Sequence, residues 1–451
     1  MKDFVHLRAP GNWINDPNGF IYYKGQYHLF YQHFPYAPRW GTMHWGHAVS
    51  SDLVHWEHLG IALFPSKDYD RNGIFSGSAM EIDGRMYLYY SGVKYLSPQP
   101  EDIHMPQDGQ FQACQALLIS EDGFHFDNWG AKQQIIPVIT DSQVGDPQNT
   151  RDPNVWREGD SYYMVLGSTC DSSVGRILFY RSDDGRSWTY ANQYTSPELG
   201  TTLECPALVP LDDGYLFLGS PMGILADGLK YQDQAVYARA DFDPKTCAFS
   251  LRERLMFLDY GLDFYAPQSI LDREGRRVLI GWMRMPKPAT NLGKERGDWS
   301  GMMSLPRVVQ VRNGQVCFQV HPNVEACFTR LVSDLSPLSE HKPVRLQGTI
   351  RNGQSWNLGG YQIQMGDGRI QTDRSMVFDH LEGFRLTAQS PQLAEDHCQL
   401  DVFVDENLIE IFINEGQYVL SHVVFGLGRT LEGNVDALYT VSDPQTREHV
   451  F

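Results

Sequence analysis

Apolar and aromatic residues occur in pairs of short runs along the first two-thirds of the chain, and a polar turn containing glycine separates the runs of each pair. Two such runs around a glycine turn predict a β-hairpin. The turns recur about every sixty residues, slightly more than the usual spacing of propeller blades. The five predicted hairpins are Phe20–Gln32, Ala79–Gly92, Asn154–Ser168, Leu208–Ser220 and Ser269–Met283.

Five hairpins at a regular spacing predict five antiparallel sheets around one axis, which is a five-bladed β-propeller. A second pattern supports the repeat, because an acidic turn followed by an aromatic residue comes after three of the hairpins, at 51–56, 120–126 and 182–188. No window of about twelve residues has helical spacing without an interrupting Gly or Pro. We therefore expect an all-β chain.

The pattern changes after Pro306. One further strand pair, Val308–Val320, precedes a short linker with at most one helical turn, and alternating strands then follow one another to the end of the chain. Such a series predicts two packed sheets, a C-terminal β-sandwich. The expected domains are a propeller at 1–320, a linker at 321–335 and a sandwich at 336–451. The predicted sandwich strands are Val344–Ile350, Gly360–Met365, Gln399–Val404, Leu408–Ile413, Tyr418–Val424 and Leu438–Val441.

Charge and cysteine content narrow the class of partner. The chain of 451 residues carries 55 acidic and 37 basic residues, a formal net charge of −18. Nucleic acid and anionic membrane are therefore poor partners, and a neutral or weakly charged small molecule is a better one. The seven scattered cysteines show no C-x-x-C pair, and no apolar leader or run of about 18 apolar residues occurs. We expect reduced thiols and a cytoplasmic location.

Three carboxylates stand just before the first strand of a predicted hairpin. They are Asp16, Asp152 and Glu204, and each is followed by a proline one or two residues later. Because the innermost strands of a propeller line its axis, equivalent positions in three blades converge on one funnel. The alternative is that these acids only stabilise turns by hydrogen bonding, a role that acidic residues also have in propeller repeats.

Converging carboxylates suit the hydrolysis of a glycosidic bond. One acid must be protonated to donate to the leaving oxygen, and another must be ionised to attack or stabilise the sugar cation. Arg151, next to Asp152, is expected to keep that carboxylate charged, which favours a stabilising role for it. The residues alone leave open which of Asp16 and Glu204 is the nucleophile and which is the acid.

The motifs around these acids resemble those of the β-fructofuranosidases of glycoside hydrolase family 32, the group of invertase, levanase, inulinase and sucrose-6-phosphate hydrolase. They follow one another in the family's order, and the C-terminal region resembles the family's β-sandwich more weakly. The matching motifs are Trp13-Ile14-Asn15-Asp16-Pro17-Asn18-Gly19, Phe30-Tyr31-Gln32, Trp40-Gly41-Thr42-Met43-His44-Trp45-Gly46-His47, Phe75-Ser76-Gly77-Ser78, Arg151-Asp152-Pro153, Glu204-Cys205-Pro206, Asp263-Phe264-Tyr265-Ala266-Pro267-Gln268 and Gly281-Trp282-Met283.

The resemblance implies a retaining, double-displacement mechanism. Asp16 is then the nucleophile, Glu204 the acid and base, and Asp152 the transition-state stabiliser. No cofactor and no metal is implied, and Cys205 is interpreted as a residue that tunes the neighbouring acid. The implied fructose-binding residues are Asn15, Gln32, Trp40, Phe75, Ser76, Arg151, Tyr265 and Trp282.

The chain departs from the family pattern in three places. His33-Phe34-Pro35 follows Gln32 where Tyr-Asn-Pro is common, Thr42 replaces a usual proline, and the C-terminal domain is short. Two H-x-x-H pairs, His44 with His47 and His55 with His58, have a spacing that can hold a metal on a helix. These segments are predicted as strand and loop, so packing and hydrogen bonding are the preferred interpretation.

The leading hypothesis is hydrolysis of terminal β-D-fructofuranosides: sucrose, short fructo-oligosaccharides or sucrose 6-phosphate. One alternative is a fructosyltransferase that uses the same covalent intermediate, and another is a propeller that only binds carbohydrate. The second alternative predicts the loss of one of the three carboxylates, and all three are present. The resemblance also allows a homodimer. The sequence does not choose among the substrates.

Overall fold

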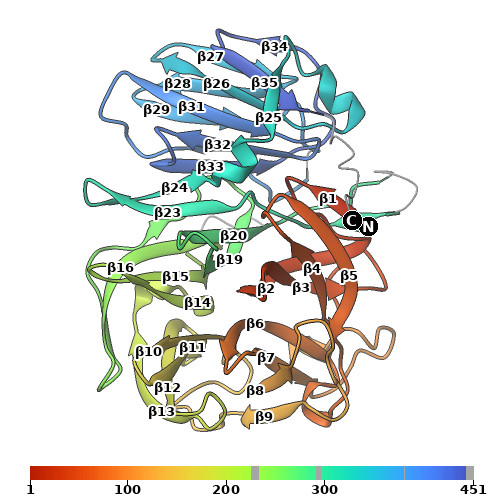
Figure 1. Cartoon of the computed structure of the whole chain (residues 1–451), viewed down its shortest axis with the longest axis vertical. Coiled ribbons are helices and arrows are strands. Elements are labelled where there is room, and N and C mark those ends of the chain that lie inside the picture. The colour runs from red at the N-terminus through yellow and green to blue at the C-terminus, as the bar shows by residue number, and fades with distance from the viewer. Residues whose placement is uncertain (225–232, 291–295, 380, 443–451) are drawn as a thin grey trace.

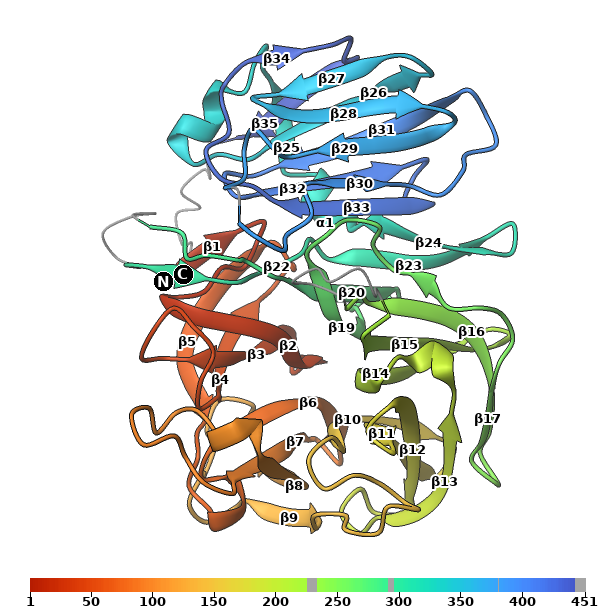
Figure 2. The same cartoon turned by 180° about the vertical axis from the view of Figure 1, so that it is seen from behind.

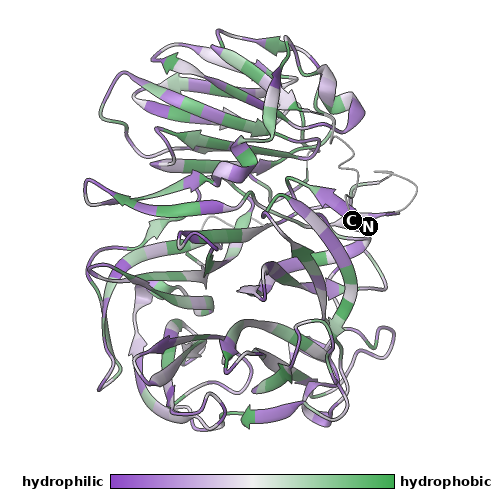
Figure 3. Cartoon of the chain, viewed as in Figure 1, coloured by the Kyte–Doolittle hydropathy of each residue, from purple (hydrophilic) through white to green (hydrophobic). Residues whose placement is uncertain are grey.

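The computed structural model describes residues 1–224, 233–290, 296–379 and 381–442. Five sheets of four to six strands surround one axis, and two sheets of five and six strands stack beside them (Figure 1). Figure 2 shows the same division from behind. Strands in both parts carry hydrophobic residues interspersed with polar ones (Figure 3). The predicted all-β architecture, a propeller followed by a β-sandwich, is confirmed.

Each sheet of the ring is a meander that starts with an inner hairpin. The first contains β1 Lys2–Phe4, β2 Asn12–Tyr23, β3 Gln26–Phe34, β4 His44–Ser50, β5 His55–Leu63 and β21 Trp299–Ser300; the second β6 Gly73–Ile82, β7 Arg85–Tyr95, β8 Phe111–Ser120 and β9 Gln133–Ile136; the third β10 Arg151–Glu158, β11 Ser161–Cys170, β12 Val174–Ser182 and β13 Thr189–Thr195. The fourth contains β14 Thr202–Leu211, β15 Gly214–Met222, β16 Val236–Asp243, β17 Ala248–Leu251 and β18 Met256–Phe257; the fifth β19 Phe264–Leu271, β20 Arg277–Met283, β22 Met302–Met303, β23 Arg307–Arg312 and β24 Gln315–Val320.

The five hairpins predicted from the sequence are the two innermost strands of each of these sheets. The innermost strand of each sheet contacts the innermost strands of its two neighbours, which closes a ring around the axis; these strands are β2, β6, β10, β14 and β19. Residues at the start of these strands therefore face a common centre although they lie far apart in the sequence.

The acidic turns predicted after three hairpins connect the third and fourth strands of the first three sheets. In each turn, one aspartate oxygen accepts hydrogen bonds from two backbone N–H groups, two and three residues further on. This is an Asx turn, which fixes the chain reversal by local bonding. The aspartates are Asp52, Asp122 and Asp184.

Two sheets form the second domain. One contains β25 Phe328–Leu331, β26 Val344–Arg351, β31 His397–Val404, β32 Leu408–Ile413, β33 Tyr418–Val423 and β35 Ala437–Val441; the other contains β27 Ser355–Leu358, β28 Tyr361–Gly366, β29 Arg369–Asp373, β30 Thr387–Gln389 and β34 Leu431–Glu432. The six predicted sandwich strands are present. Strand β25 was missed because it lies in the predicted linker, and the short strands β27, β29, β30 and β34 because their outward residues are polar and their apolar residues are few.

Little helix is present among the described residues. It comprises one helical turn, α1 Pro322–Glu325, and short 3₁₀ turns at Asp68–Asp70, Gln107–Gly109, Pro197–Leu199 and Ser336–Glu340. Within the described ranges, no helix is long and apolar enough to cross a membrane. β25, which follows α1, pairs with β35 of the sandwich. The expected domain limits at 320 and 336 stay a prediction.

The two domains meet across a core that contains buried charges. The Arg307 guanidinium from the fifth propeller sheet lies 2.7 Å from Glu410 Oε2 of the sandwich and 2.8 Å from Asp259 Oδ2. The two ring nitrogens of His6 lie 2.9 Å from Asp405 and 3.0 Å from Glu410. These ion pairs join the N-terminal segment and the propeller to the turn between β31 and β32 and to β32 itself.

Candidate active site

A one-residue irregularity in strand pairing occurs near the start of each innermost strand. In β2 it falls between Ile14 and Pro17, and corresponding shifts occur in β6, β10, β14 and β19. A bulge of this kind adds a residue to one strand and redirects its side chains. Asp152 and Cys205 have positive φ angles of 64° and 46°, a strained backbone that is typical of functional positions.

The bulges correct one step of the sequence argument. Asp16 and Asp152 directly precede a proline, but the residue directly before Pro206 is Cys205. Glu204 lies one residue earlier, at the position that Arg151 holds in β10. Counted from the last paired residue before each bulge, Glu204 is that residue, Asp152 lies one residue after it, and Asp16 lies two residues after it. The three carboxylates therefore occupy three different repeat positions, and the expectation that they share one was wrong.

The Asp16 carboxylate accepts hydrogen bonds from a hydroxyl and an amide, in addition to the contact with the Cys205 thiol. Its Oδ2 accepts from Ser76 Oγ at 2.6 Å, and its Oδ1 accepts from Asn15 Nδ2 at 3.2 Å. Trp13 Nε1 donates to Asn15 Oδ1 at 2.8 Å and so fixes the amide orientation. Burial and the negative charge of Glu204 raise the pKa of Asp16, although the Ser76 hydrogen bond opposes this. The oxygen is oriented, yet its charge is only partly compensated.

Glu204 has a different environment. Arg151 Nη2 donates to its Oε1 at 2.8 Å, and the Tyr265 hydroxyl lies 2.8 Å from its Oε2 and 2.9 Å from the Ser220 carbonyl oxygen. The single phenol hydrogen can be donated to either oxygen. The carboxyl therefore lies between a fixed cation and a group that can exchange hydrogen-bond roles with it.

Asp152 is not held charged by its sequence neighbour, which corrects the second step of the argument. The Arg151 side chain turns to Glu204, and the pKa of Asp152 rises to about 7 because burial and the charges of Glu204 and Asp16 outweigh the attraction of Arg151. Asp152 Oδ2 accepts from the Cys205 backbone N–H at 2.9 Å. Near neutral pH this carboxyl exchanges a proton readily.

The sequence interpretation linked Cys205 to the neighbouring acid Glu204, but its thiol lies between the carboxylates of Asp16 and Asp152. Its Sγ is 3.5 Å from Asp16 Oδ2 and 3.6 Å from Asp152 Oδ2. Burial and the adjacent carboxylates raise its pKa well above the usual thiol value. The thiol is therefore protonated and can donate its single hydrogen to Asp16 or to Asp152, while Glu204 acts on it only through its charge.

The remaining predicted residues contact one another, other aromatic rings or the backbone, and within the described structure none is paired with the carboxylates. Trp40 and Phe75 lie edge to face at 5.9 Å, and the Gln32 amide nitrogen donates to the Ile74 carbonyl oxygen at 2.9 Å. Trp282 packs edge-on against Trp13 at 5.8 Å. Its buried Nε1 has no hydrogen-bond partner among the described residues, so it is available to a bound hydroxyl group.

Sequence reasoning missed a buried polar relay behind Asp152. The Asp152 backbone N–H donates to Ser91 Oγ at 2.9 Å, Ser91 donates to Gln115 Oε1 at 2.7 Å, and Gln115 Nε2 donates to the Thr150 carbonyl oxygen at 3.0 Å. The relay holds the strained bulge in place. A glutamine inside the apolar run of β8 was the signal that could have revealed it.

The histidines of the two H-x-x-H pairs all have partners inside the fold. Among the described residues, no three His, Cys, Asp or Glu side chains are grouped as a metal site. The partners are the Thr42 carbonyl for His44, His28 for His47, Asp52 for His55 and Asp3 for His58.

One buried and two half-buried carboxylates, one guanidinium and one tyrosine around the axis of a propeller are the groups of an enzyme that cleaves glycosidic bonds. The family description "Glycosyl hydrolases family 32 N-terminal domain" matches residues 6–322, and "Glycosyl hydrolases family 32 C terminal" matches residues 360–438. The chain belongs to glycoside hydrolase family 32, which confirms the resemblance seen in its motifs.

Similar proteins cover nearly the whole chain. The sucrose-6-phosphate hydrolase of Escherichia coli is 34% identical over 93% of this chain and 88% of its own length, and an Escherichia coli raffinose invertase is 33% identical over the same shares. Among solved structures, a Bombyx mori GH32 beta-fructofuranosidase is 28% identical with a TM-score of 0.80, covering 98% of this chain and 93% of that one. A substituted form of the Bombyx mori enzyme was solved in complex with sucrose.

Proposed function

We propose that this chain is a β-fructofuranosidase that releases terminal β-D-fructofuranosyl units from sucrose, short fructo-oligosaccharides or sucrose 6-phosphate. The observation that carries the proposal is the contrast between Asp16 and Glu204. Asp16 presents an oriented carboxylate without a cation, while Glu204 lies between Arg151 and Tyr265. Two acids in such different environments suit the nucleophile and the acid of a retaining glycosidase.

In the first step, an Asp16 carboxylate oxygen attacks the anomeric carbon of fructose while the bond to the leaving oxygen breaks. The Glu204 carboxyl donates its proton to that oxygen, so the leaving sugar departs as a neutral alcohol. Ser76 and Asn15 fix the nucleophile by their hydrogen bonds to its two oxygens. The product is a fructosyl ester of Asp16.

In the second step, the Glu204 carboxylate accepts a proton from water, and the water oxygen attacks the anomeric carbon. The ester bond to Asp16 breaks, which frees the carboxylate and releases fructose with its configuration retained. Arg151 Nη2 lies 2.8 Å from Glu204 Oε1 and holds this carboxylate in position beside the site. Glu204 therefore donates one proton in the first step and recovers one in the second.

Asp152 stabilises the transition state through fructose hydroxyl groups. Its position beside Cys205 and its raised pKa of about 7 suit a carboxyl that shares protons with bound hydroxyls. The buried indole N–H of Trp282 adds a donor without a protein partner, and the aromatic walls suit the apolar face of a sugar. The proposed fructose-binding residues are Asn15, Gln32, Trp40, Phe75, Ser76, Arg151, Tyr265 and Trp282.

The similar proteins support the substrate class. Their names refer to sucrose 6-phosphate and raffinose, and the Bombyx mori enzyme was seen with sucrose. A comparison of kcat/KM on sucrose, sucrose 6-phosphate, kestose and inulin will rank the substrates. A fructosyltransferase would release oligosaccharide in place of free fructose at high sucrose concentration.

Location and assembly belong to the proposal as well. All seven cysteines have free thiols, which supports a cytoplasmic location. A homodimer is the assembly proposed from the family resemblance, and light scattering at several protein concentrations tests it.

The test compares two variants on two leaving groups. Asp16→Asn is expected to lower kcat/KM by about 10⁴-fold on sucrose and on a fructoside with an acidic phenol leaving group, because both need the nucleophile. Glu204→Gln is expected to lose as much on sucrose but far less in the first step on the phenol, which leaves without protonation. Gln399→Ala, a substitution on the exposed surface of the sandwich, serves as the control. Parent-like hydrolysis of sucrose by both active-site variants would refute the proposal.

A further inference from the structure

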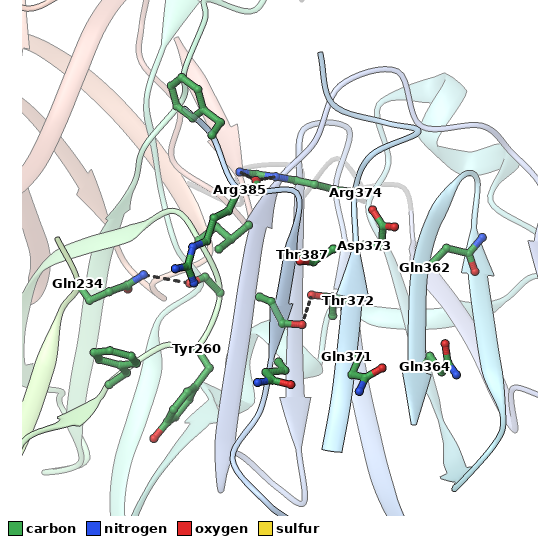
Figure 4. Close-up of a pocket in the computed structure, with 16 residues that line it drawn as sticks. Gln234, Tyr260, Gln362, Gln364, Gln371, Thr372, Asp373, Arg374, Arg385 and Thr387 are labelled. Atoms are coloured by element: carbon green, nitrogen blue, oxygen red, sulfur yellow. Dashed lines mark hydrogen bonds between the residues drawn. The ribbon is translucent and has the colours of Figure 1, made fainter. Parts of the chain in front are cut away.

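A cavity of about 720 Å³ lies where the propeller faces the sandwich, and its walls do not include the three carboxylates. Figure 4 shows its lining side chains on neighbouring sandwich strands and, opposite them, on the propeller. The volume is in the range of small-molecule binding sites. Nothing in the proposed hydrolysis uses these residues.

The sandwich wall is an ordered array of polar side chains. Strands β28, β29 and β30 alternate, so that Ile363 and Ile370 enter the sandwich core while their neighbours point outward. Among the described residues, none of the four outward glutamines has a side-chain hydrogen-bond partner. The strand register aligns Gln362, Asp373 and Thr387 in one row and Gln364, Gln371 and Gln389 in the next.

The propeller wall adds aromatic rings and one buried acceptor. Phe257 and Tyr260 lie edge to face at 5.7 Å. Gln234 is only 4% exposed, and its Nε2 donates to the Gly261 carbonyl oxygen at 3.3 Å. Its buried Oε1 has no partner among the described residues, a state that is unfavourable unless a ligand supplies a donor.

The charged residues of the cavity are already engaged. Arg374 Nη1 donates to Asp263 Oδ2 at 2.6 Å and to the Val423 carbonyl oxygen at 2.9 Å, and Asp373 Oδ1 accepts from the Ser375 N–H at 2.7 Å. Arg385 also has a partner within the protein. The groups left for a ligand are amides, a hydroxyl, the second carboxylate oxygen of Asp373 and aromatic rings, which favour a neutral polyhydroxylated molecule over an anion.

We propose that this cavity is a second carbohydrate-binding site for a neutral oligosaccharide, separate from the catalytic carboxylates. The amide rows exchange hydrogen bonds with sugar hydroxyls, Gln234 Oε1 accepts one more, and the rings of Phe257 and Tyr260 cover an apolar sugar face. The inference depends on the proposed function only for the choice of a fructo-oligosaccharide as the probe.

The test measures binding without turnover. The full chain carrying Glu204→Gln is titrated with kestose by calorimetry, and two sites are expected, the weaker one in the millimolar range, about −4 kcal/mol. Adding Gln364→Ala and Gln371→Ala is expected to weaken the second site at least tenfold and leave the first unchanged. Gln399→Ala, an exposed glutamine on β31 outside the cavity, is the matched control.

Three results would overturn the inference. They are a single site in the titration, a second site that the paired glutamine substitutions do not weaken, and a second site that binds sucrose 6-phosphate tenfold more tightly than sucrose. Sucrose hydrolysis by the parent chain is measured separately. Loss of the proposed function with intact glutamine-dependent binding would leave this site standing, and the reverse result would remove the site alone.

Discussion

Two groups of buried charge in this molecule differ in their balance. At the propeller axis, Asp16, Asp152 and Glu204 lie together, and of these three only Glu204 forms an ion pair among the described residues, with Arg151. Burial and mutual repulsion raise the pKa values of Asp16 and Asp152.

At the domain interface, the carboxylates have matching cations. Asp405 pairs with Arg8 and His6, and Glu410 pairs with Arg307 and His6. Burial opposes ionisation there too, but these cations lower the pKa values of Asp405 and Glu410. The uncompensated negative charge at the propeller axis thus suits proton transfer, and the paired charges at the interface suit the stable association of the two domains.

The largest expected effect comes from breaking the balance at the interface. Arg307→Met leaves Asp259 and Glu410 buried without their cation, so it is expected to lower the free energy of unfolding by about 3–5 kcal/mol. Arg307→Lys keeps the charge but loses the planar fork, and an intermediate loss is expected. Urea unfolding measures both. Specific activity of the folded fraction stays within about twofold of the parent, and a selective loss of kcat would contradict the comparison.

Removing excess charge at the axis is expected to have the opposite sign. Asp152→Asn eliminates a carboxyl whose pKa in the folded state is about 7 against 3.8 ordinarily. The cost of ionising it is absent below about pH 3.8 and complete above about pH 7. The variant is therefore expected to gain about 1–4 kcal/mol of stability above pH 7, a gain that fades toward pH 4, while sucrose hydrolysis falls sharply. Lower stability at pH 8 than the parent would contradict this.

His6 is expected to make a smaller, pH-dependent contribution at the interface. Burial disfavours its charge, but Asp405 and Glu410 raise its pKa overall. Its stabilising effect is then complete below the ordinary histidine pKa of 6.5 and is lost as pH rises through the raised value. His6→Gln is expected to cost about 2 kcal/mol at pH 6 and less at high pH. A difference in melting temperature that does not change with pH would refute the assignment.

Cys205 is expected to give the smallest effect, and one that identifies its partner. The thiol contacts Asp16 and lowers its pKa slightly, so Cys205→Ala should shift the acidic limb of kcat/KM upward by less than about one pH unit. Cys205→Ser supplies a stronger donor and should shift the same limb downward. Movement of the alkaline limb alone would show that Glu204 is the group affected, as the sequence interpretation held.

Much of this fold was predictable because its signals are local. Hairpin turns and strand alternation identify the inner strands of the ring and most of the sandwich. The motif around Asp16 indicates the site. The direction in which Arg151 turns was not predictable, since it depends on a bulge in β10 that brings its guanidinium to Glu204 in β14. The contacts of Cys205 depend on the same geometry.

The glutamine array of the interdomain cavity was also beyond sequence reasoning. Gln364 and Gln371 lie on strands whose pairing register, not spacing along the chain, aligns them. Strand β29 was not predicted from the sequence because its outward residues are polar, and without it the pairing register could not be predicted.

The claim that Asp16 is the nucleophile is tested most directly by trapping the covalent intermediate. In Glu204→Gln, a fructoside with a phenol leaving group should form the ester quickly, while its hydrolysis, which needs the base, is slow. Mass spectrometry after acid quench and digestion is predicted to find one added fructosyl unit on the peptide that contains Asp16. A fructosyl unit on another residue, or product of inverted configuration with no adduct, would contradict the account.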